Sequence, residues 1–296
     1  MSMKTHSCPA KLNLFLEIRR KREDGYHELG TLFQALEFGD TLSAEPWDRI
    51  EVVSDREIPG RAEDNLVYKA AQLLHSHYPD RLKPHDGIRF SLSKRIPTGA
   101  GLGGGSSDAA TALRLANAIW RLNLSNEELR RLAPQLGADV AFFLFQPTAF
   151  AEGRGEALSP APDPFPFHVV IATPRCHVET AWAYQQLHGK PFGNHWQTFK
   201  QLYAGQANHP EFYSGLHNDF EAPISAHFKE IRQVQEILNA FCPVKTLLTG
   251  SGASLFALFQ DEKTAQNCPG RAGNIKKGNG VLCKESVAKY AFMQQN

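Results

Sequence analysis

The sequence predicts an α+β fold in two lobes, and three observations support that prediction. The chain has 296 residues, which is enough for about two domains that each bury a substantial core. Strand-like and helix-like patterns are mixed in both halves of the chain, as α+β lobes require. Prolines at every second position from Pro160 to Pro166 interrupt the chain, so we expect one domain over residues 1–159 and a second over residues 160–296.

The elements expected before these prolines begin with a strand over residues 7–18, in which leucines alternate with other side chains. Lys11 and Asn13 point to the same face of such a strand. A turn at Asp24-Gly25 follows it. The other elements expected in this half are strands over 32–38, 41–45, 49–54, 87–96 and 148–158, and helices over 63–77, 106–122 and 125–136.

The second half is expected to continue the mixture. The predicted elements are strands over 167–172, 244–248 and 253–259, and helices over 179–188, 195–204 and 221–241. The segment 262–280 is polar and contains glycines, so we expect a loop there.

Composition narrows the class of protein. The formal net charge is +1 and no block of like charge occurs, which gives nucleic-acid binding no electrostatic support. The longest uninterrupted apolar run, over residues 140–145, is too short to span a membrane. Five cysteines are scattered without a C-x-x-C pair, and the order of charge and apolarity at the N-terminus is the reverse of a signal peptide. We therefore expect a cytoplasmic protein that binds neither nucleic acid nor membrane; no oligomeric state is predicted.

The most informative stretch is Pro97-Thr-Gly-Ala-Gly-Leu-Gly-Gly-Gly-Ser-Ser107, which lies between an expected strand and an expected helix. Glycines let backbone approach a ligand closely. A helix N-terminus adds unpaired N–H groups and a partial positive charge. Together these features predict a site for an anion, above all for a nucleotide phosphate.

Other glycine signatures fit this stretch less well. A P-loop requires Gly-Lys-Ser/Thr, and the run contains no lysine. The dinucleotide fingerprint is formally matched by Gly99, Gly101 and Gly104, so a nicotinamide enzyme stays an alternative. Its acidic ribose partner is missing, however, because Glu127 and Glu128 follow Ser125 as a helix capping box. The sequence elements of protein kinases do not occur, and a flexible surface turn is disfavoured by the ordered flanks.

Three further motifs carry possible chemistry. Pro9-Ala-Lys-Leu-Asn13 places a lysine on the first strand, where it is either a solvated residue or a catalytic one. Asp139, in Gly-Ala-Asp-Val, is either a helix cap or a general base for a substrate hydroxyl. A nearby Lys11 would keep that carboxylate ionised. Thr249-Gly-Ser-Gly252, between two apolar strands, is either a plain turn or a wall of the same site.

Taken together, these motifs resemble those of the GHMP small-molecule kinases. The resemblance implies a two-lobed fold, with an N-terminal ribosomal-protein-like βαβ lobe that has a left-handed crossover and a C-terminal ferredoxin-like lobe. It implies an ATP-dependent kinase in which Lys11 and Asp139 are catalytic. The family usually has proline where this chain has Ala141, which leaves Asp139 in register. The residues that the resemblance assigns to ATP are Pro97, Thr98, Gly99, Ala100, Gly101, Leu102, Gly103, Gly104, Gly105, Ser106 and Ser107 around the phosphates, with Asn65 and Lys94 near the adenine.

A second substrate is implied by Asp24-Gly-Tyr-His-Glu-Leu29 and by His217-Asn-Asp-Phe-Glu221. These segments resemble the family members of isoprenoid precursor biosynthesis whose small-molecule acceptor carries a cytidine diphosphate group. The resemblance extends to about residue 260, and it assigns Asn13, Tyr26, His27 and Tyr184 to this substrate. Mg²⁺ is expected to accompany ATP, and the hydroxyls of Ser106 and Ser107 are its candidate protein ligands, with neither assigned. A mevalonate or homoserine kinase, and a non-catalytic nucleotide-binding module, are the alternatives.

Overall fold

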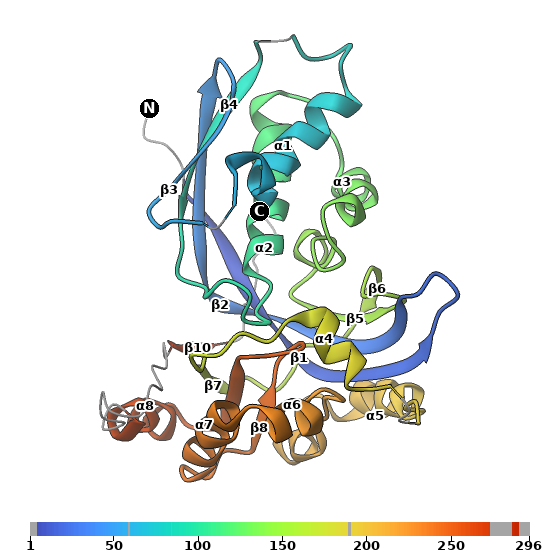
Figure 1. Ribbon diagram of the computed structural model, residues 1–296, viewed down its shortest axis with the longest axis vertical. Helices are drawn as coiled ribbons and strands as arrows, with labels where there is room; N and C mark the ends of the chain where they lie inside the picture. The colour runs from blue at the N-terminus through green and yellow to red at the C-terminus, as the bar shows by residue number, and fades with distance from the viewer. Residues whose placement is uncertain (1–4, 59, 84, 189–190, 273–285, 290–296) are drawn as a thin grey trace. The chain divides into compact units, whose positions relative to one another are not determined.

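Apolar alternation near the N-terminus produces two long paired strands, β1 (His6–Lys21) and β2 (His27–Trp47). The predicted turn at Asp24-Gly25 joins them, with Gly25 at φ 83°. The two strands predicted over 32–38 and 41–45 are one continuous strand, because Gly39 packs against the backbone of Cys8 without interrupting β2. The computed structural model (Figure 1) describes residues 5–58, 60–83, 85–188, 191–272 and 286–289.

The chain forms two packed units, each built from segments that are distant in sequence. The first unit contains residues 1–10, 39–98 and 103–146, and the second contains residues 11–38, 99–102 and 147–296. The domain boundary predicted between residues 159 and 160 stays a prediction, because these units are defined by packing and not by chain order. Helices and strands are mixed in both, so the α+β class is confirmed.

The first unit is a sheet with helices packed on it (Figure 1). The C-terminal part of β2 pairs antiparallel with β4 (Gly87–Ser93), and β3 (Ile50–Ser54) pairs parallel with β4. Helix α1 (Leu66–His77) connects these two parallel strands as a βαβ unit, and it packs against α2 (Gly104–Ile119). The remaining helical segments of this unit are η1 (Ala62–Asp64), α3 (Asn126–Leu132), η2 (Ala133–Gln135) and η3 (Phe142–Leu144).

The second unit holds the N-terminal part of β2, which pairs with β5 (Thr148–Glu152), and β5 pairs with β6 (Ala157–Pro160). Its other sheet has the order β10-β7-β9-β8. The strands of that sheet are β7 (His168–Ala172), β8 (Lys245–Leu248), β9 (Leu255–Phe259) and β10 (Ser286–Lys289). The helical segments are α4 (Thr180–Gln185), α5 (Trp196–Gln206), η4 (Pro210–Gly215), α6 (Glu221–His227), α7 (Lys229–Asn239) and α8 (Glu262–Ala272).

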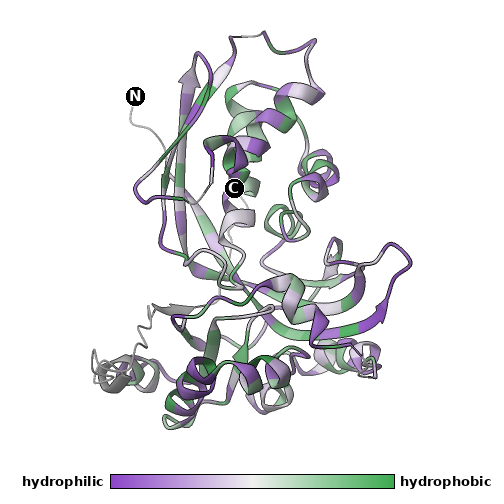
Figure 2. Ribbon diagram, in the orientation of Figure 1, coloured by the Kyte–Doolittle hydropathy of each residue, from purple (hydrophilic) through white to green (hydrophobic). Residues whose placement is uncertain are grey.

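Helix α7 shows how apolar spacing builds the core of the second unit. Ile231, Val234 and Leu238 are all buried, and their spacing of three and four residues places them on one face of the helix. That face packs against β8 and β9, whereas the other positions are polar apart from Ile237, so Figure 2 shows both green and purple along α7. No helix in the described part of the chain is long and apolar enough to cross a membrane.

Two further predicted elements are wrong in detail. The strand predicted over 148–158 is the hairpin β5–β6, because Gly153 and Gly155 take positive φ values and turn the chain. The helix predicted over 221–241 is interrupted at Phe228, which is extended and packs edge-on against Trp182. The apolar periodicity of a helix does not indicate a contact with a residue this distant in sequence.

The loop predicted over 262–280 begins as helix α8. Asp261 accepts a hydrogen bond from the backbone N–H of Thr264 (2.7 Å), which stabilises the start of the helix. Ala265 and Cys268 are buried one turn apart, so even a polar helix anchors one face here. The part of the predicted loop over residues 273–280 lies outside the described residues.

Candidate functional site

The glycine run ends in a helix N-terminus, as predicted, but α2 begins two residues earlier, at Gly104. Gly99, Gly101 and Gly103 have φ values of 67°, 79° and 70°, in the left-handed region that favours glycine. Gly103 occupies the N-cap of α2 and no side chain caps the helix, which leaves the first N–H groups of α2 available to an anion.

Ser107 lies in the first turns of α2, and its hydroxyl has a distinctive environment. The residue is fully buried, and within the described residues its Oγ has no hydrogen-bond partner. A buried hydroxyl without a partner is unfavourable unless a ligand or a water satisfies it. Ser107 therefore fits a role in holding a polar ligand at this helix end.

A buried charge network lies beneath the helix in the first unit. The Lys94 ammonium is paired with Asp40 and with Asp108 Oδ2, the latter at 2.7 Å. Burial acts to lower the pKa of Lys94, but attraction to Asp108 and Asp40 outweighs it and the pKa lies above its usual value. Burial raises the pKa of Asp108 to about 6, with Lys94 opposing and Asp40 adding to that rise.

The Asp108→Asn variant is expected to change the pH dependence of stability. Between about pH 4 and pH 6 the folded protein keeps a proton on Asp108 that the unfolded chain has lost, so the free energy of unfolding falls as the pH rises. By pH 7 the free energy of unfolding has fallen by roughly 3 kcal/mol through this group. Asparagine does not titrate, so the variant should not show this fall. Urea unfolding of both proteins from about pH 2.5 to pH 7 measures the difference.

Asp55→Asn is the matched control, because the exposed Asp55 accepts hydrogen bonds from Ser93 Oγ (2.5 Å) and the Lys94 amide (2.9 Å). The first of these bonds lowers the pKa of Asp55 most, so its stabilisation is lost as the pH falls below about 4. As the pH rises, Asp108 lowers the free energy of unfolding of the wild type and Asp55 raises it. The two substitutions should therefore change the slope of stability against pH in opposite directions. If the free energy of unfolding of the wild type and that of Asp108→Asn changed with pH in parallel, the pKa of Asp108 would not be raised by folding.

Asn65 and Asp139 also belong to the first unit. Asn65 is the N-cap of α1, and its Oδ1 accepts the Val67 amide at 2.9 Å. Asp139 is half-buried in the turn in which the Val140 amide bonds to Gly137 O at 3.2 Å. The next helical segment, η3, has Ala141 at its N-cap, so the alternative of Asp139 as a helix cap is wrong.

In the second unit, Lys11 and Asn13 lie on the same face of β1, as the strand alternation predicts. Lys11 Nζ donates a hydrogen bond of 2.6 Å to Asn13 Oδ1, and both residues are buried. The ammonium also lies 5.2 Å from the centre of the Phe33 ring. The alternative of Lys11 as a solvated strand residue is therefore wrong.

The turn at Thr249-Gly-Ser-Gly252 is bound to β1 by hydrogen bonds. The Gly252 amide bonds to Thr249 O at 3.1 Å and closes the turn, and Thr249 Oγ1 accepts the Asn13 amide at 3.1 Å. Asn218 Nδ2 donates to Leu248 O (2.8 Å) and Gly250 O (2.9 Å). Asn218 was missed as a structural residue of the site, although it lies within the sequence motif 217–221.

Residues 100–102 of the glycine run contact both of these segments. The Lys11 amide donates to Leu102 O at 2.9 Å, and the Ser254 amide donates to Ala100 O at 3.3 Å. A Cβ atom at Gly101 would lie 2.3 Å from Thr249 O, so only glycine allows this approach. Three motifs that are distant in sequence therefore meet within the second unit.

The residues assigned to a second substrate include two stacked rings. His27 and Tyr184 lie 4.8 Å apart between ring centroids with an interplanar angle of 21°. Tyr26 is 52% exposed, and the Arg154 guanidinium lies over its ring at 3.7 Å. Burial, with Lys21 and His188, lowers the pKa of His27, so its neutral ring offers one donor and one acceptor.

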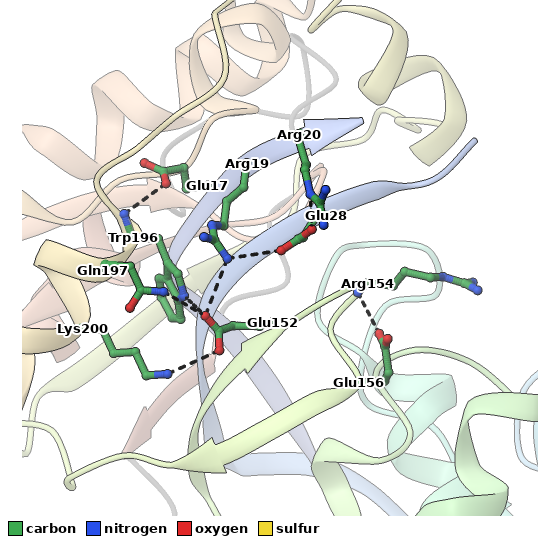
Figure 3. A network of polar contacts seen from close by, with 10 residues as sticks. All are labelled: Glu17, Arg19, Arg20, Glu28, Glu152, Arg154, Glu156, Trp196, Gln197 and Lys200. Carbon is green, nitrogen blue, oxygen red and sulfur yellow. Dashed lines mark hydrogen bonds and ion pairs between the residues drawn. The ribbon is translucent and has the colours of Figure 1, made fainter. Parts of the chain in front are cut away.

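Figure 3 shows how the β1–β2 hairpin that carries Tyr26 and His27 is held in place. Glu28 pairs with Arg19 and Arg20 across the two strands. Glu152 accepts a hydrogen bond of 2.6 Å from Trp196 Nε1 on α5. A Cβ atom at Gly30 would lie 2.4 Å from the Trp196 ring, which rests directly on β2. The hairpin is therefore anchored to β5 and α5 by charge and by packing.

Any Mg²⁺ that accompanies ATP would be held here together with the phosphates. Among the described residues, no group of three or more His, Cys, Asp or Glu side chains is placed to hold a metal. Mg²⁺ bound with a nucleotide needs only one or two protein oxygens, since phosphates and waters supply the rest. The Ser107 hydroxyl, which has no partner among the described residues, is available to supply such an oxygen.

Comparison with known proteins identifies the family. The model of the GHMP kinases N terminal domain matches residues 65–146, and the GHMP kinases C terminal model matches residues 200–272. A Hahella chejuensis protein named 4-diphosphocytidyl-2-C-methyl-D-erythritol kinase is 41% identical over 268 residues, which cover 88% of this chain and 87% of that protein. The chain belongs to the 4-diphosphocytidyl-2-C-methyl-D-erythritol kinases of the GHMP family.

Further comparisons agree with this assignment. A Thermodesulfovibrio yellowstonii protein of the same name is 35% identical over 95% of this chain and 96% of its own length. A crystal structure of 4-(cytidine 5'-diphospho)-2C-methyl-D-erythritol kinase matches with a TM-score of 0.79 and 31% identity, over 97% of this chain and all of that one. A homoserine kinase from Cytophaga hutchinsonii, with a TM-score of 0.74 and 17% identity over 97% of this chain and 94% of its own, shares the fold. The GHMP-kinase-like fold predicted from the sequence is confirmed, and this member is a small-molecule kinase that uses ATP.

Proposed function

We propose that this GHMP kinase transfers the γ-phosphoryl group of ATP to the 2-hydroxyl of 4-diphosphocytidyl-2-C-methyl-D-erythritol, in the non-mevalonate synthesis of isoprenoid precursors. The observation that carries the proposal is the meeting of residues 100–102, the Lys11–Asn13 strand and the turn at 249–252 within one unit. The names of the relatives supply the acceptor. A cytoplasmic location, expected from the composition, belongs to the same proposal.

The charges of Asp139 and Lys11 suggest their roles in phosphoryl transfer. The acceptor hydroxyl must lose its proton as the phosphoryl group arrives, and Asp139 accepts that proton. Lys11 supplies positive charge to the reacting oxygens, and its contact with Asn13 Oδ1 orients the ammonium. Because phosphoryl transfer requires little covalent chemistry from a protein, positioning and charge account for most of the catalysis.

ATP is held mainly by backbone in this proposal. The N–H groups of residues 99–107 at the N-terminus of α2 bind its phosphates, with Asn65 and Lys94 on the adenine side. Because Asp40 and Asp108 already engage the Lys94 ammonium, we assign Lys94 a positional role there. Mg²⁺ would offset phosphate charge, and the Ser107 hydroxyl is the protein oxygen best suited to hold it.

Recognition of the acceptor rests on its cytosine. Tyr26 and Tyr184 present aromatic faces on which a base can stack, and the neutral His27 can pair with a polar base edge. We assign Asn13, which is buried beside Lys11, to the sugar alcohol portion. Mevalonate and homoserine have no base, so neither substrate accounts for this aromatic group.

The test is a comparison of acceptors with purified protein, ATP and Mg²⁺. We expect phosphorylation of the cytidine-diphosphate-bearing acceptor, detected as a new phosphomonoester by ³¹P NMR. Mevalonate and homoserine should give at least ~100-fold lower kcat/KM. Cytidine diphosphate alone should inhibit competitively against the acceptor. Equal turnover of mevalonate or homoserine would contradict the proposed acceptor, and absence of ADP formation with any acceptor would contradict the kinase assignment.

Replacement of Tyr184 by leucine is expected to raise the KM for the cytidine-bearing acceptor about tenfold or more, because stacking on an aromatic ring contributes roughly 1–3 kcal/mol per base. The KM for ATP should stay within about twofold. Tyr184→Phe is the matched control, since it keeps the ring that stacks with His27 and removes only the hydroxyl. If both variants keep the wild-type KM for the acceptor, Tyr184 does not contact the base.

A further inference from the structure

We propose that Asp40 is a positioning residue for ATP binding, which sets the geometry of the glycine run by holding the chain on both sides of it. The proposal rests on the proposed function, because it takes residues 97–103 to be the phosphate-binding loop. Asp40 lies on β2, is fully buried, and carries no motif that singles it out in the sequence.

The first step concerns the chain before the loop. Strand β4 ends at Ser93, and the next amides need partners other than a neighbouring strand. Asp40 Oδ1 accepts hydrogen bonds from the amides of both Arg95 and Ile96, the latter at 2.7 Å. Pro97 has no N–H group. Asp40 therefore holds the last two backbone donors before the loop.

The second step concerns the chain after the loop. A Cβ atom at Gly104, the first residue of α2, would lie 3.3 Å from Asp40 Oδ2 and 2.9 Å from Ile96 Cγ2. The start of α2 therefore rests on the same carboxylate and on the residue that this carboxylate binds. Residues 96 and 104, at the two ends of the loop, therefore both lie against Asp40.

The third step distinguishes the two things that Asp40 does, which are to bind the backbone before the loop and to neutralise the Lys94 ammonium. Asp40 Oδ2 and Asp108 Oδ2 share the Lys94 ammonium, so both carboxylates contribute to the same buried ion pair. Within the described residues, Asp108 engages Lys94 from inside α2 through Oδ2, and its Oδ1 has no hydrogen-bond partner. The two aspartates therefore form a natural comparison, since they share a cation and only one of them binds the backbone that enters the loop.

The experiment compares Asp40→Asn with Asp108→Asn. An asparagine at position 40 cannot serve two amides and an ammonium at once, because one of its side-chain atoms is a donor. We expect the KM for ATP, and the dissociation constant of a non-hydrolysable ATP analogue measured by calorimetry, to rise about tenfold or more in Asp40→Asn. Both constants should change by less than about threefold in Asp108→Asn, and the KM for the acceptor by less than about twofold in both variants.

Equal effects of the two substitutions on ATP affinity would overturn the proposal, since the ion pair alone would then account for them. A folded Asp40→Asn protein with wild-type ATP affinity would overturn it as well. If Asp40→Asn does not fold, hydrogen exchange of the wild-type protein tests the proposal instead. The Ile96 amide should then be protected like a strand amide without nucleotide, and exchange at the rate of an exposed loop would contradict the proposal. Calorimetry with the ATP analogue needs no acceptor, so failure of the proposed acceptor would leave this test intact.

Discussion

Replacement of Asp139 by asparagine is expected to lower kcat by roughly 10³-fold, while the affinity for ATP stays within a few-fold of the wild type. The substitution keeps the size of the side chain in the turn before Val140 but removes its capacity to accept a proton. A positioned general base contributes typically 10²–10⁴-fold to the rate, so this variant tests the whole of that contribution. Initial rates at saturating ATP and acceptor measure kcat, and calorimetry measures ATP binding.

Two controls make the Asp139 result specific. Asp139→Ala should lose as much activity as Asp139→Asn, because neither side chain accepts a proton. Asp163→Asn changes an exposed aspartate in the proline-rich segment and should keep wild-type turnover. Normal turnover of either Asp139 variant would refute the assignment of Asp139 as the base, and a parallel loss of ATP binding would point to a structural role.

Replacement of Gly101 by alanine is expected to lower kcat/KM for ATP by at least ~100-fold, because the loop would have to move. The new Cβ would lie 2.3 Å from Thr249 O and 3.0 Å from Gly252 O, and the φ of 79° at this position is unfavourable for alanine. Backbone strain and the clash together should lower the free energy of unfolding by roughly 2–4 kcal/mol. Displacement of catalytic groups by about 1 Å is enough to lower a rate by two orders of magnitude.

Gly205→Ala is the matched control for this substitution. A Cβ atom at Gly205, near the end of α5, meets no atom within 4 Å, and alanine is favoured over glycine in a helix by about 0.5–1 kcal/mol. Urea unfolding and steady-state kinetics should therefore show wild-type activity and equal or higher stability for Gly205→Ala. A Gly101→Ala protein with wild-type kinetics would show that residues 100–102 do not need their close contact with the turn at 249–252.

Much of the local structure could be predicted because its cause is local. The capping box formed by Ser125 and Glu128 is present at the start of α3, as its spacing indicates. Strand alternation places Lys11 and Asn13 on one face of β1, and their side chains are hydrogen-bonded. The glycine run leads into a helix N-terminus for the same reason, since glycines and the alanine-rich sequence after them favour that conformation directly.

Other features could not be predicted, because distant residues decide them. Nothing in residues 221–241 indicates that the helix is interrupted at Phe228, where packing against Trp182 is favourable. Asp40 follows a glycine in an ordinary strand, and its role depends on amides more than fifty residues later in the chain. Asn218 lies in a recognisable motif, but its bonds to Leu248 O and Gly250 O require the folded second unit.

The sequence by itself determined the family and the glycine run that leads into α2, because these depend on short motifs with fixed spacing. The tertiary structure alone decided which groups shape the site. Before the loop, Asp40 accepts the hydrogen bond of a backbone amide that has no neighbouring strand to pair with. Thr249 O approaches Gly101 so closely that no side chain fits there. The physical reason is that a buried carboxylate or a close backbone contact gains its effect from partners brought together only by folding, which no local pattern records.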